Sequence, residues 1–297
     1  MQMLSEFEIL TYISQQTPFE AEIEGGAFKI KIEGYQPAIC TAIHAGHRLR
    51  PDLTDKCALT EQQRLYEEDP YTNTMIASLP ITLTGQDSRY EYDLNRALSS
   101  CIYTHAWGKQ VWAAPLSKAQ RELSRQKHRQ FYRVLRALIS QLEKMFGGCV
   151  LFDIHSYNHQ RIKRETPVFN IGSKQINMER WGETVKLYLK TLGDTKLTHS
   201  RVTTAQNDVF YGLGYLTRQV NRFHTNCLVL PTEVKKIYLD ESSGNPFPQV
   251  LSELTTGIKL AITETTAYFS QKYSYAIDWS QREFQPGALT LDIGAQS

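Results

Sequence analysis

The pattern of apolar and polar positions predicts strands that alternate with helices. Residues 149–152 (CVLF) form an apolar run without turn residues, which is typical of a buried strand, and Asp153 and His155 follow at its end. A second run at 227–230 predicts another buried strand, which leads into Glu233. On a strand, Asp153 shares a face with His155, whereas Lys236 lies out of phase with Glu233 and should point the other way.

Further strands are expected nearer the start of the chain. Residues 20–35 alternate around Gly25-Gly26, which predicts a β-hairpin, and residues 38–43 predict a strand that ends at His44. Residues 167–171 fit one more strand.

Three segments carry the spacing of amphipathic helices. Between residues 117 and 146 apolar side chains recur every three or four positions, the opposite face is basic, and Gly147 is placed to end the helix. Residues 178–192 and 247–269 show the same spacing. We therefore expect a single α/β domain over residues 1–275, with a mixed central sheet flanked by helices and with residues 1–35 as an N-terminal hairpin extension. Residues 276–297 are polar and predict a loosely packed tail.

Composition narrows the class of protein. The chain has 297 residues, 41% hydrophobic and 22% charged, with a net charge of +2, which predicts a globular domain without a nucleic-acid partner. Because no apolar run approaches the ~20 residues of a bilayer span, no membrane partner is expected. The five cysteines are widely spaced, which favours a reduced, cytoplasmic protein.

Groups suited to metal-assisted hydrolysis stand at the ends of the expected strands and in the loops between them. They are His44, His47, Glu68, Asp69, Asp93, Asn95, Arg96, His155 and Glu233. Two imidazoles and a carboxylate commonly hold zinc, a further carboxylate can transfer protons, and a guanidinium can bind a substrate carboxylate. Asp153 is placed to support His155 as the hydrogen-bond partner of a metal-bound imidazole. Each group alone also fits a structural role: a loop histidine, a solvated acidic turn, or an ion pair of Asp93 with Arg96.

The order of motifs resembles the N-formylglutamate amidohydrolases, a family of zinc hydrolases related in fold to carboxypeptidases and aspartoacylase. The motifs, spread over residues 38–270, are HAG (44–46), EEDPYTN (67–73), RYEYDLNR (89–96), FDIHSY (152–157), GLGYLTRQ (212–219) and PTEVKKIYLDE (231–241).

The resemblance implies a zinc-carboxypeptidase-like fold and a role for each matching residue. His44 and His155 become ligands of one Zn²⁺ per chain, although another divalent metal would also suit them. Asn95 and Arg96, with Asp93 beside them, become the site for the substrate's α-carboxylate. Glu233 becomes the general base, and Arg89 is a candidate for stabilising the oxyanion.

The third ligand stays open among three residues. The formylglutamate group has an acidic cluster that matches Glu68 and Asp69, and we favour Asp69. Carboxypeptidases instead use a position three residues after the first histidine, which is His47 here.

The expected function is hydrolysis of the amide of a small N-acyl amino acid such as N-formylglutamate. A metallocarboxypeptidase-like peptidase, or a deacylase of another N-acyl amino acid, fits the same groups. A non-catalytic protein that binds an amino acid or peptide is the alternative from another class. The oligomeric state and a second metal are left open.

Overall fold

The computed structural model describes residues 1–273, and these build one mixed sheet with helices on both faces. The sheet has nine strands in the order β1-β2-β3-β5-β4-β8-β11-β9-β10, with parallel pairing at its centre and antiparallel pairing at β2–β3, β3–β5 and β11–β9. The predicted fold class, a mixed sheet flanked by helices, is confirmed.

The strands are β1 (Gln2–Leu4), β2 (Phe19–Ile23), β3 (Phe28–Ile32), β4 (Ala38–Ala42), β5 (Ile81–Gly85), β8 (Cys149–Tyr157), β9 (Phe169–Ile171), β10 (Thr204–Gln206) and β11 (Cys227–Lys235), with β6 (His105–Ala106) and β7 (Lys109–Gln110) as a separate hairpin. The helices are α1 (Glu6–Ser14), α2 (Pro51–Thr54), α3 (Glu61–Glu67), α4 (Thr72–Ile76), α5 (Lys118–Phe146), α6 (Met178–Gly193), α7 (Tyr215–Phe223) and α8 (Pro248–Tyr273). Among these described helices, none is both long and apolar enough to cross a membrane.

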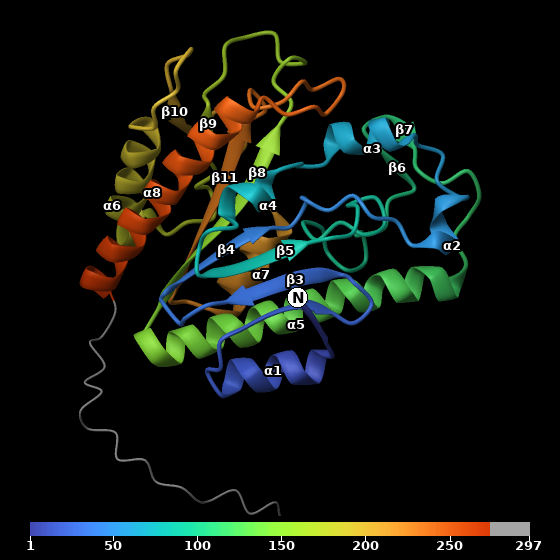
Figure 1. The fold of residues 1–297 in the computed structure, drawn as a ribbon, viewed down its shortest axis with the longest axis horizontal. Helices are drawn as coiled ribbons and strands as arrows, with labels where there is room; N and C mark the ends of the chain where they lie inside the picture. Colours follow the sequence, from blue (N-terminus) through green and yellow to red (C-terminus); the bar gives the residue numbers. More distant parts are fainter. Residues whose placement is uncertain (274–297) are drawn as a thin grey trace, which may run out of the picture.

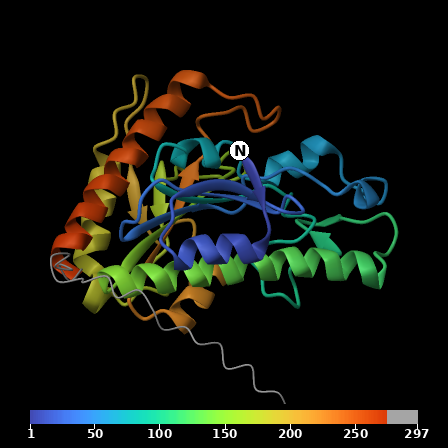
Figure 2. The ribbon, with the colours of Figure 1, turned by 60° about the horizontal axis from the view of Figure 1, so that its bottom comes forward.

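Alternating side chains give the sheet two apolar faces. On β8, Leu151 packs into the cluster covered by α1, α5 and α7, whereas Phe152 packs into the cluster covered by α4, α6 and α8. Figures 1 and 2 show α1 and α5 together on one side of the sheet, and Figure 1 shows α6 and α8 side by side near strands β9 and β10. Because Asp153 and His155 continue the Leu151 face, they reach the carboxyl end of the sheet on the side of α5 and α7.

The three predicted long helices are present. Ser117 caps α5 by accepting a hydrogen bond from the backbone of Gln120, whose side chain bonds back to Ser117, and Gly147 ends the helix at φ 78°. The predicted segments 178–192 and 247–269 correspond to α6 and α8.

The two central strands are longer than their apolar runs predicted. β8 continues to Tyr157 and β11 to Lys235, so His155 and Glu233 lie within strands, in register with each other. Both strands have neighbours on both sides, and buried backbone groups must be hydrogen-bonded, so the ladder continues past the apolar residues. Pro231, which lacks an N–H, still accepts a hydrogen bond from the Gly172 N–H at 3.1 Å.

The predicted hairpin is present as β2 and β3, with Gly25 and Gly26 at φ 84° and 74° in the turn. It joins the sheet through pairing of β3 with β5. The sequence analysis did not predict β1, α1, β5 or β10, although residues 81–84 (ITLT) of β5 alternate apolar and polar side chains. The tail expected at 276–297 lies outside the described residues.

Candidate metal centre and active site

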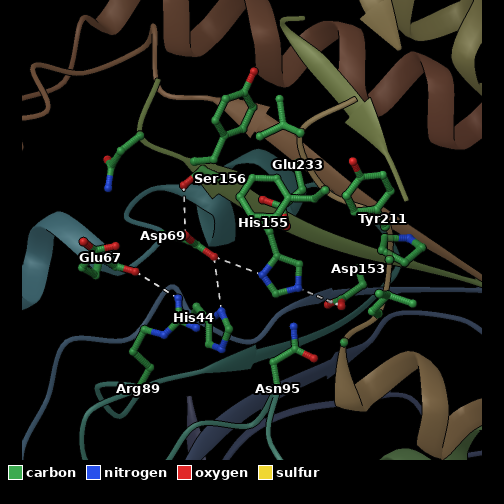
Figure 3. Close-up of a pocket in the computed structure, with 18 of the residues that line it drawn as sticks. His44, Glu67, Asp69, Arg89, Asn95, Asp153, His155, Ser156, Tyr211 and Glu233 are labelled. Atoms are coloured by element: carbon green, nitrogen blue, oxygen red, sulfur yellow. Dashed lines mark hydrogen bonds and ion pairs between the residues drawn. The ribbon is translucent and has the colours of Figure 1, made fainter. Parts of the chain in front are cut away.

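His44, Asp69 and His155 meet at the carboxyl end of the sheet, and all three are buried (Figure 3). Their nearest ligand-type atoms lie within 4.8 Å of one another. The Nδ1 atoms of His155 and His44 lie 3.1 and 3.4 Å from the Asp69 Oδ2 atom. The structure thus gathers two imidazoles and one carboxylate from the residues that the sequence predicted as ligands.

Each histidine is oriented by a carboxylate on its far side. Asp93 Oδ1 lies 2.8 Å from His44 Nε2, and Asp153 Oδ2 lies 2.8 Å from His155 Nε2. Both Nδ1 atoms are therefore directed at Asp69, and that of His44 is buried without a hydrogen-bond partner. Two imidazoles, each held by a carboxylate, beside a third carboxylate are the ligand arrangement that zinc takes in proteins. The residues present fit a divalent metal.

The electrostatics of the cluster also suit a cation. Burial favours the neutral form of Asp69, but the nearby imidazoles of His155 and His44 together outweigh burial and lower the pKa of Asp69 below the ordinary value. Burial opposes the charge of His155, but Asp153 and Asp69 raise its pKa well above the ordinary value. The positive charge of the His155 imidazolium thus lies between the carboxylates of Asp153 and Asp69. A divalent ion bound beside Asp69 would replace this charge, and His155 would release its proton on binding the ion.

Loop contacts aim Asp69 at the histidines. Its backbone N–H donates to the His44 carbonyl at 3.0 Å, its own carbonyl accepts from Thr72 Oγ1 at 2.7 Å, and Ser156 Oγ donates to Oδ1 at 3.2 Å. Two residues on, Tyr71 adopts φ 66°, a conformation that is costly for a bulky residue. The direction of Asp69 is therefore built into the turn rather than left to a flexible side chain.

The close approach of two loops explains why the HAG motif has glycine at position 46. A Cβ at this position would lie 2.2 Å from the backbone carbon of Gln86, so only glycine lets the two loops pack together. Arg48 N–H then donates to the Gln86 carbonyl at 3.2 Å, and Ser88 N–H to the Arg48 carbonyl at 2.7 Å. This contact places the loop that carries His44 against the loop that carries Arg89 and Asp93.

Glu233 lies beside the cluster and lines a cavity of about 370 Å³. It is paired in register with His155 across the β8–β11 ladder. Burial raises its pKa to about 8, and within the described residues no hydrogen bond reaches its carboxylate. A carboxylate that is free of partners and has a pKa near neutrality is suited to proton transfer.

The predicted substrate-binding residues Asn95 and Arg96 line the same cavity. Asn95 Oδ1 accepts from the Leu216 N–H at 3.3 Å, which ties it to the start of α7. A Cβ at Gly214 would lie 2.4 Å from that oxygen, so a larger residue there would displace the Asn95 side chain. Arg96 is exposed and donates to the Asn95 carbonyl at 3.0 Å.

Arg89 also lines the cavity but is already engaged. Its Nε and Nη2 donate to Asp93 Oδ2 at 3.2 and 2.8 Å, and its Nη1 donates to the Glu67 carbonyl at 3.0 Å.

Three predicted site residues lie elsewhere. Asp93, expected near the substrate, is fully buried behind His44 and does not line the cavity. Glu68 and His47, the alternative third ligands, hydrogen-bond to each other, and Glu68 also accepts from Ser88. The loop contact at Gly46 turns His47 away from His44, which accounts for the difference.

The sequence did not point to several residues that line the cavity. Lys236 was predicted to face away from Glu233, yet it lines the same cavity: β11 ends at Lys235, so the strand alternation stops there. Trp107, the 209–213 loop and the ion pair of Arg161 with Glu67 also line the cavity. Glu67 and residues 212–213 belong to the motifs quoted above but had no assigned role, and the other positions lie in loops that no motif marks.

Comparison with known proteins agrees with this architecture. A sequence model of the N-formylglutamate amidohydrolases matches residues 36–239. A search of curated proteins found no match.

Among solved structures, an N-formylglutamate amidohydrolase from Ralstonia eutropha is 17% identical with a TM-score of 0.70, covering 82% of this chain and 98% of that one. A gene product of Agrobacterium tumefaciens is 14% identical with a TM-score of 0.61, covering 82% and 96%. A metallo-carboxypeptidase from Burkholderia cenocepacia is 14% identical with a TM-score of 0.42, covering 88% and 68%, which is too distant to support a conclusion about the site. The match over most of its length shows that this chain belongs to the N-formylglutamate amidohydrolase family, a family of hydrolases that act on amide bonds.

Proposed function

We propose that this protein is a zinc-dependent hydrolase that cleaves the amide of an N-acyl amino acid of the N-formylglutamate type. The observation that carries the proposal is the cluster of His44, Asp69 and His155 beside the unpartnered carboxylate of Glu233, in one cavity.

His44, Asp69 and His155 would hold the metal through two nitrogen atoms and one carboxylate oxygen. This donor set suits zinc, and Asp93 and Asp153 keep both imidazoles in the required orientation. A bound zinc ion lowers the pKa of water toward ~7 and polarises a carbonyl.

Glu233 would accept the proton of the attacking water and deliver it to the leaving amine. Its pKa of about 8 in the metal-free protein keeps it near the pH at which both transfers are efficient, and a nearby cation would lower that value further into the working range. Arg89 would stabilise developing negative charge, since its guanidinium lines the cavity and is fixed by Asp93.

Arg96 and Asn95 would bind the free carboxylate of the substrate. Within the described residues, Arg96 has no carboxylate partner, and its guanidinium can form a charge-assisted hydrogen bond with a substrate carboxylate.

The decisive experiment combines metal analysis with kinetics on N-acyl amino acids. Purified protein should contain about one zinc per chain and release amine from N-formyl substrates. Glu233→Gln should keep the metal and substrate affinity while kcat falls about 10²–10⁴-fold. Glu20→Gln, at an exposed strand glutamate on β2, is the matched control and should behave as wild type. Loss of metal from Glu233→Gln would make Glu233 a ligand, and unchanged turnover would remove it from the mechanism.

A further inference from the structure

The cations around the cavity are mostly engaged. Arg89 is bound to Asp93, Arg161 donates to the two Glu67 carboxylate oxygens at 2.9 and 3.2 Å, and Lys236 donates to the carbonyls of Tyr66 and Glu68 at 2.8 and 2.7 Å. Among the described cationic side chains that line the cavity, Arg96 differs from these three. It has no carboxylate partner and donates to a single carbonyl, that of Asn95.

One available guanidinium matches one substrate carboxylate. An N-acyl glutamate carries two, and burying a carboxylate without a partner is unfavourable. The charge pattern therefore favours an amino acid whose side chain is not acidic.

Trp107 supplies an apolar wall at the edge of the cavity. It forms the tip of the β6–β7 hairpin, where it and Gly108 have φ 48° and 74°. Such turns favour Asn or Gly, and a bulky aromatic residue in this conformation is strained. The turn alone would not select tryptophan, and strained residues of this kind concentrate at ligand sites.

The indole is held in place by aromatic and cationic neighbours. Its ring centroid lies 5.6 Å from that of Tyr90 and 5.8 Å from that of Tyr103, and the Arg89 guanidinium lies 4.9 Å above it. Even so, 39% of Trp107 stays exposed, and it lines the cavity. Its position is therefore fixed while part of its surface faces the space for a ligand.

The 209–213 loop adds further apolar surface to the lining of the same cavity. Phe210, Tyr211 and Leu213 are 37%, 47% and 61% exposed. Phe210 packs against Tyr157 at the end of β8, with ring centroids 5.7 Å apart. A cavity of about 370 Å³ with this lining is within the size range of sites that enclose drug-sized ligands.

We propose that the site selects N-acyl amino acids with a single carboxylate and a large apolar side chain, and that Trp107 is the residue that binds this side chain. The inference rests on the proposed function and changes one part of its substrate: the N-acyl amino acid is kept, and an apolar side chain replaces the acidic side chain of glutamate. The Arg96 N–H donates to the Asp93 carbonyl at 3.1 Å, the Tyr103 hydroxyl donates to the Asp93 carboxylate, and the Tyr103 ring packs on Trp107. The carboxylate and apolar contacts therefore lie on one side of the cavity. The amino-acid side chain, which shares its carbon with the carboxylate, fits that arrangement better than the acyl group.

The first test compares three substrates with the zinc-loaded wild-type enzyme. N-formylnorleucine and N-formylglutamate have side chains of similar length and differ in charge, while N-hexanoylglycine places the apolar group on the acyl side. We expect kcat/KM for N-formylnorleucine to exceed the others by about tenfold or more. Equal or better hydrolysis of N-formylglutamate would overturn the inference, and preference for N-hexanoylglycine would overturn the side-chain assignment.

The same ligands separate this inference from the proposed function. If zinc-loaded enzyme hydrolyses none of them, the proposed function fails, and calorimetric binding then decides the selectivity. Tighter binding of N-formylnorleucine than of N-formylglutamate supports the inference, and equal, weaker or absent binding overturns it.

The second test removes the apolar wall that Trp107 forms. Trp107→Asn suits the turn, so the hairpin should persist, while the kcat/KM ratio of N-formylnorleucine to N-formylalanine should fall about tenfold, mainly through KM. A ratio taken on one sample is independent of the folded fraction. Phe7→Ala, at an aromatic residue of α1 that is 78% exposed, should leave the ratio unchanged. An unchanged ratio in Trp107→Asn would overturn the role of Trp107.

Glu67→Gln tests the charge argument independently, because it frees Arg161 from its partner. It should raise kcat/KM for N-formylglutamate relative to N-formylnorleucine by about tenfold. No change in that ratio would show that the number of free cations does not govern selectivity.

Discussion

His155 and Glu233 lie on adjacent parallel strands, whereas His44, Asp69 and Asp93 lie in loops outside the strands. His155 and Glu233, the strand half of the site, are positioned by apolar packing, because the ladder that aligns Leu151 with Val229 also aligns His155 with Glu233. His44, Asp69 and Asp93, the loop half of the site, are positioned by polar contacts among residues 44–96. One of these is made by the Asp93 carboxylate, which joins His44 to Arg89. The site therefore combines two ways of placing side chains. Core packing fixes the register of the two strands, and charged contacts fix the orientation of the loop residues.

The largest expected effect tests whether both halves bind the metal. His155→Ala from the strands and His44→Ala from the loops should each lower zinc affinity by more than the ~10–100-fold cost of losing a supporting carboxylate. The reason is that each removes one of three donors from the cluster. Elemental analysis after dialysis, with chelator competition, measures this. Stoichiometric zinc in either variant would show that its half of the cluster is not needed.

The two supporting carboxylates should separate metal affinity from stability. Asp153→Asn and Asp93→Asn should each cost about 10–100-fold in zinc affinity, because each weakens the hold on one imidazole. Asp93→Asn should also lower the free energy of unfolding of the metal-free protein by about 3–5 kcal/mol, since it leaves the Arg89 guanidinium without its partner.

Asp153 has Thr41 and His155 as its partners, and His155 keeps the Asp69 carboxylate at 3.1 Å when Asp153 is changed, so Asp153→Asn should cost only about 1–3 kcal/mol. Denaturant unfolding of both metal-free variants checks the difference. Equal losses would contradict the view that charge pairing holds the loop half more than the strand half.

The strand half was the more predictable from sequence. The apolar runs before Asp153 and before Glu233 predicted two buried strands, and strand alternation predicted the contact of Asp153 with His155, which is present at 2.8 Å. The loop half depended on contacts between distant residues: Gly46 with Gln86, and Asp93 with His44 across 49 positions. Local patterns do not specify such contacts, so Asp93 was expected at the substrate and Trp107 was not expected at all.

The strand half should also respond to pH through Glu233. Burial raises its pKa from an ordinary 4.5 to about 8, so between these values the folded metal-free protein holds a proton that the unfolded chain releases. Stability from this group is therefore present at pH 4.5 and lost as pH rises to about 8. Glu233→Gln should reduce the fall in unfolding free energy between pH 5 and pH 8.5 by on the order of 2–4 kcal/mol. The same fall in both proteins would assign the pH dependence to other groups, such as His155.

The smallest expected effect concerns the loop residues that resemble ligands in the sequence. His47 is bonded to Glu68 and lies 3.3 Å from Glu61 Oε1, so its removal takes no donor from the cluster. Asp69 supplies the carboxylate that both Nδ1 atoms face, and an amide is a poor zinc ligand. We therefore expect His47→Ala to change zinc affinity by less than about threefold, while Asp69→Asn lowers it by more than about a hundredfold. Chelator competition on the two variants, prepared side by side, makes the measurement. If His47→Ala releases the metal and Asp69→Asn retains it, the third ligand follows the carboxypeptidase spacing, and the loop half binds metal through a different turn from the one that the Gly46 contact imposes.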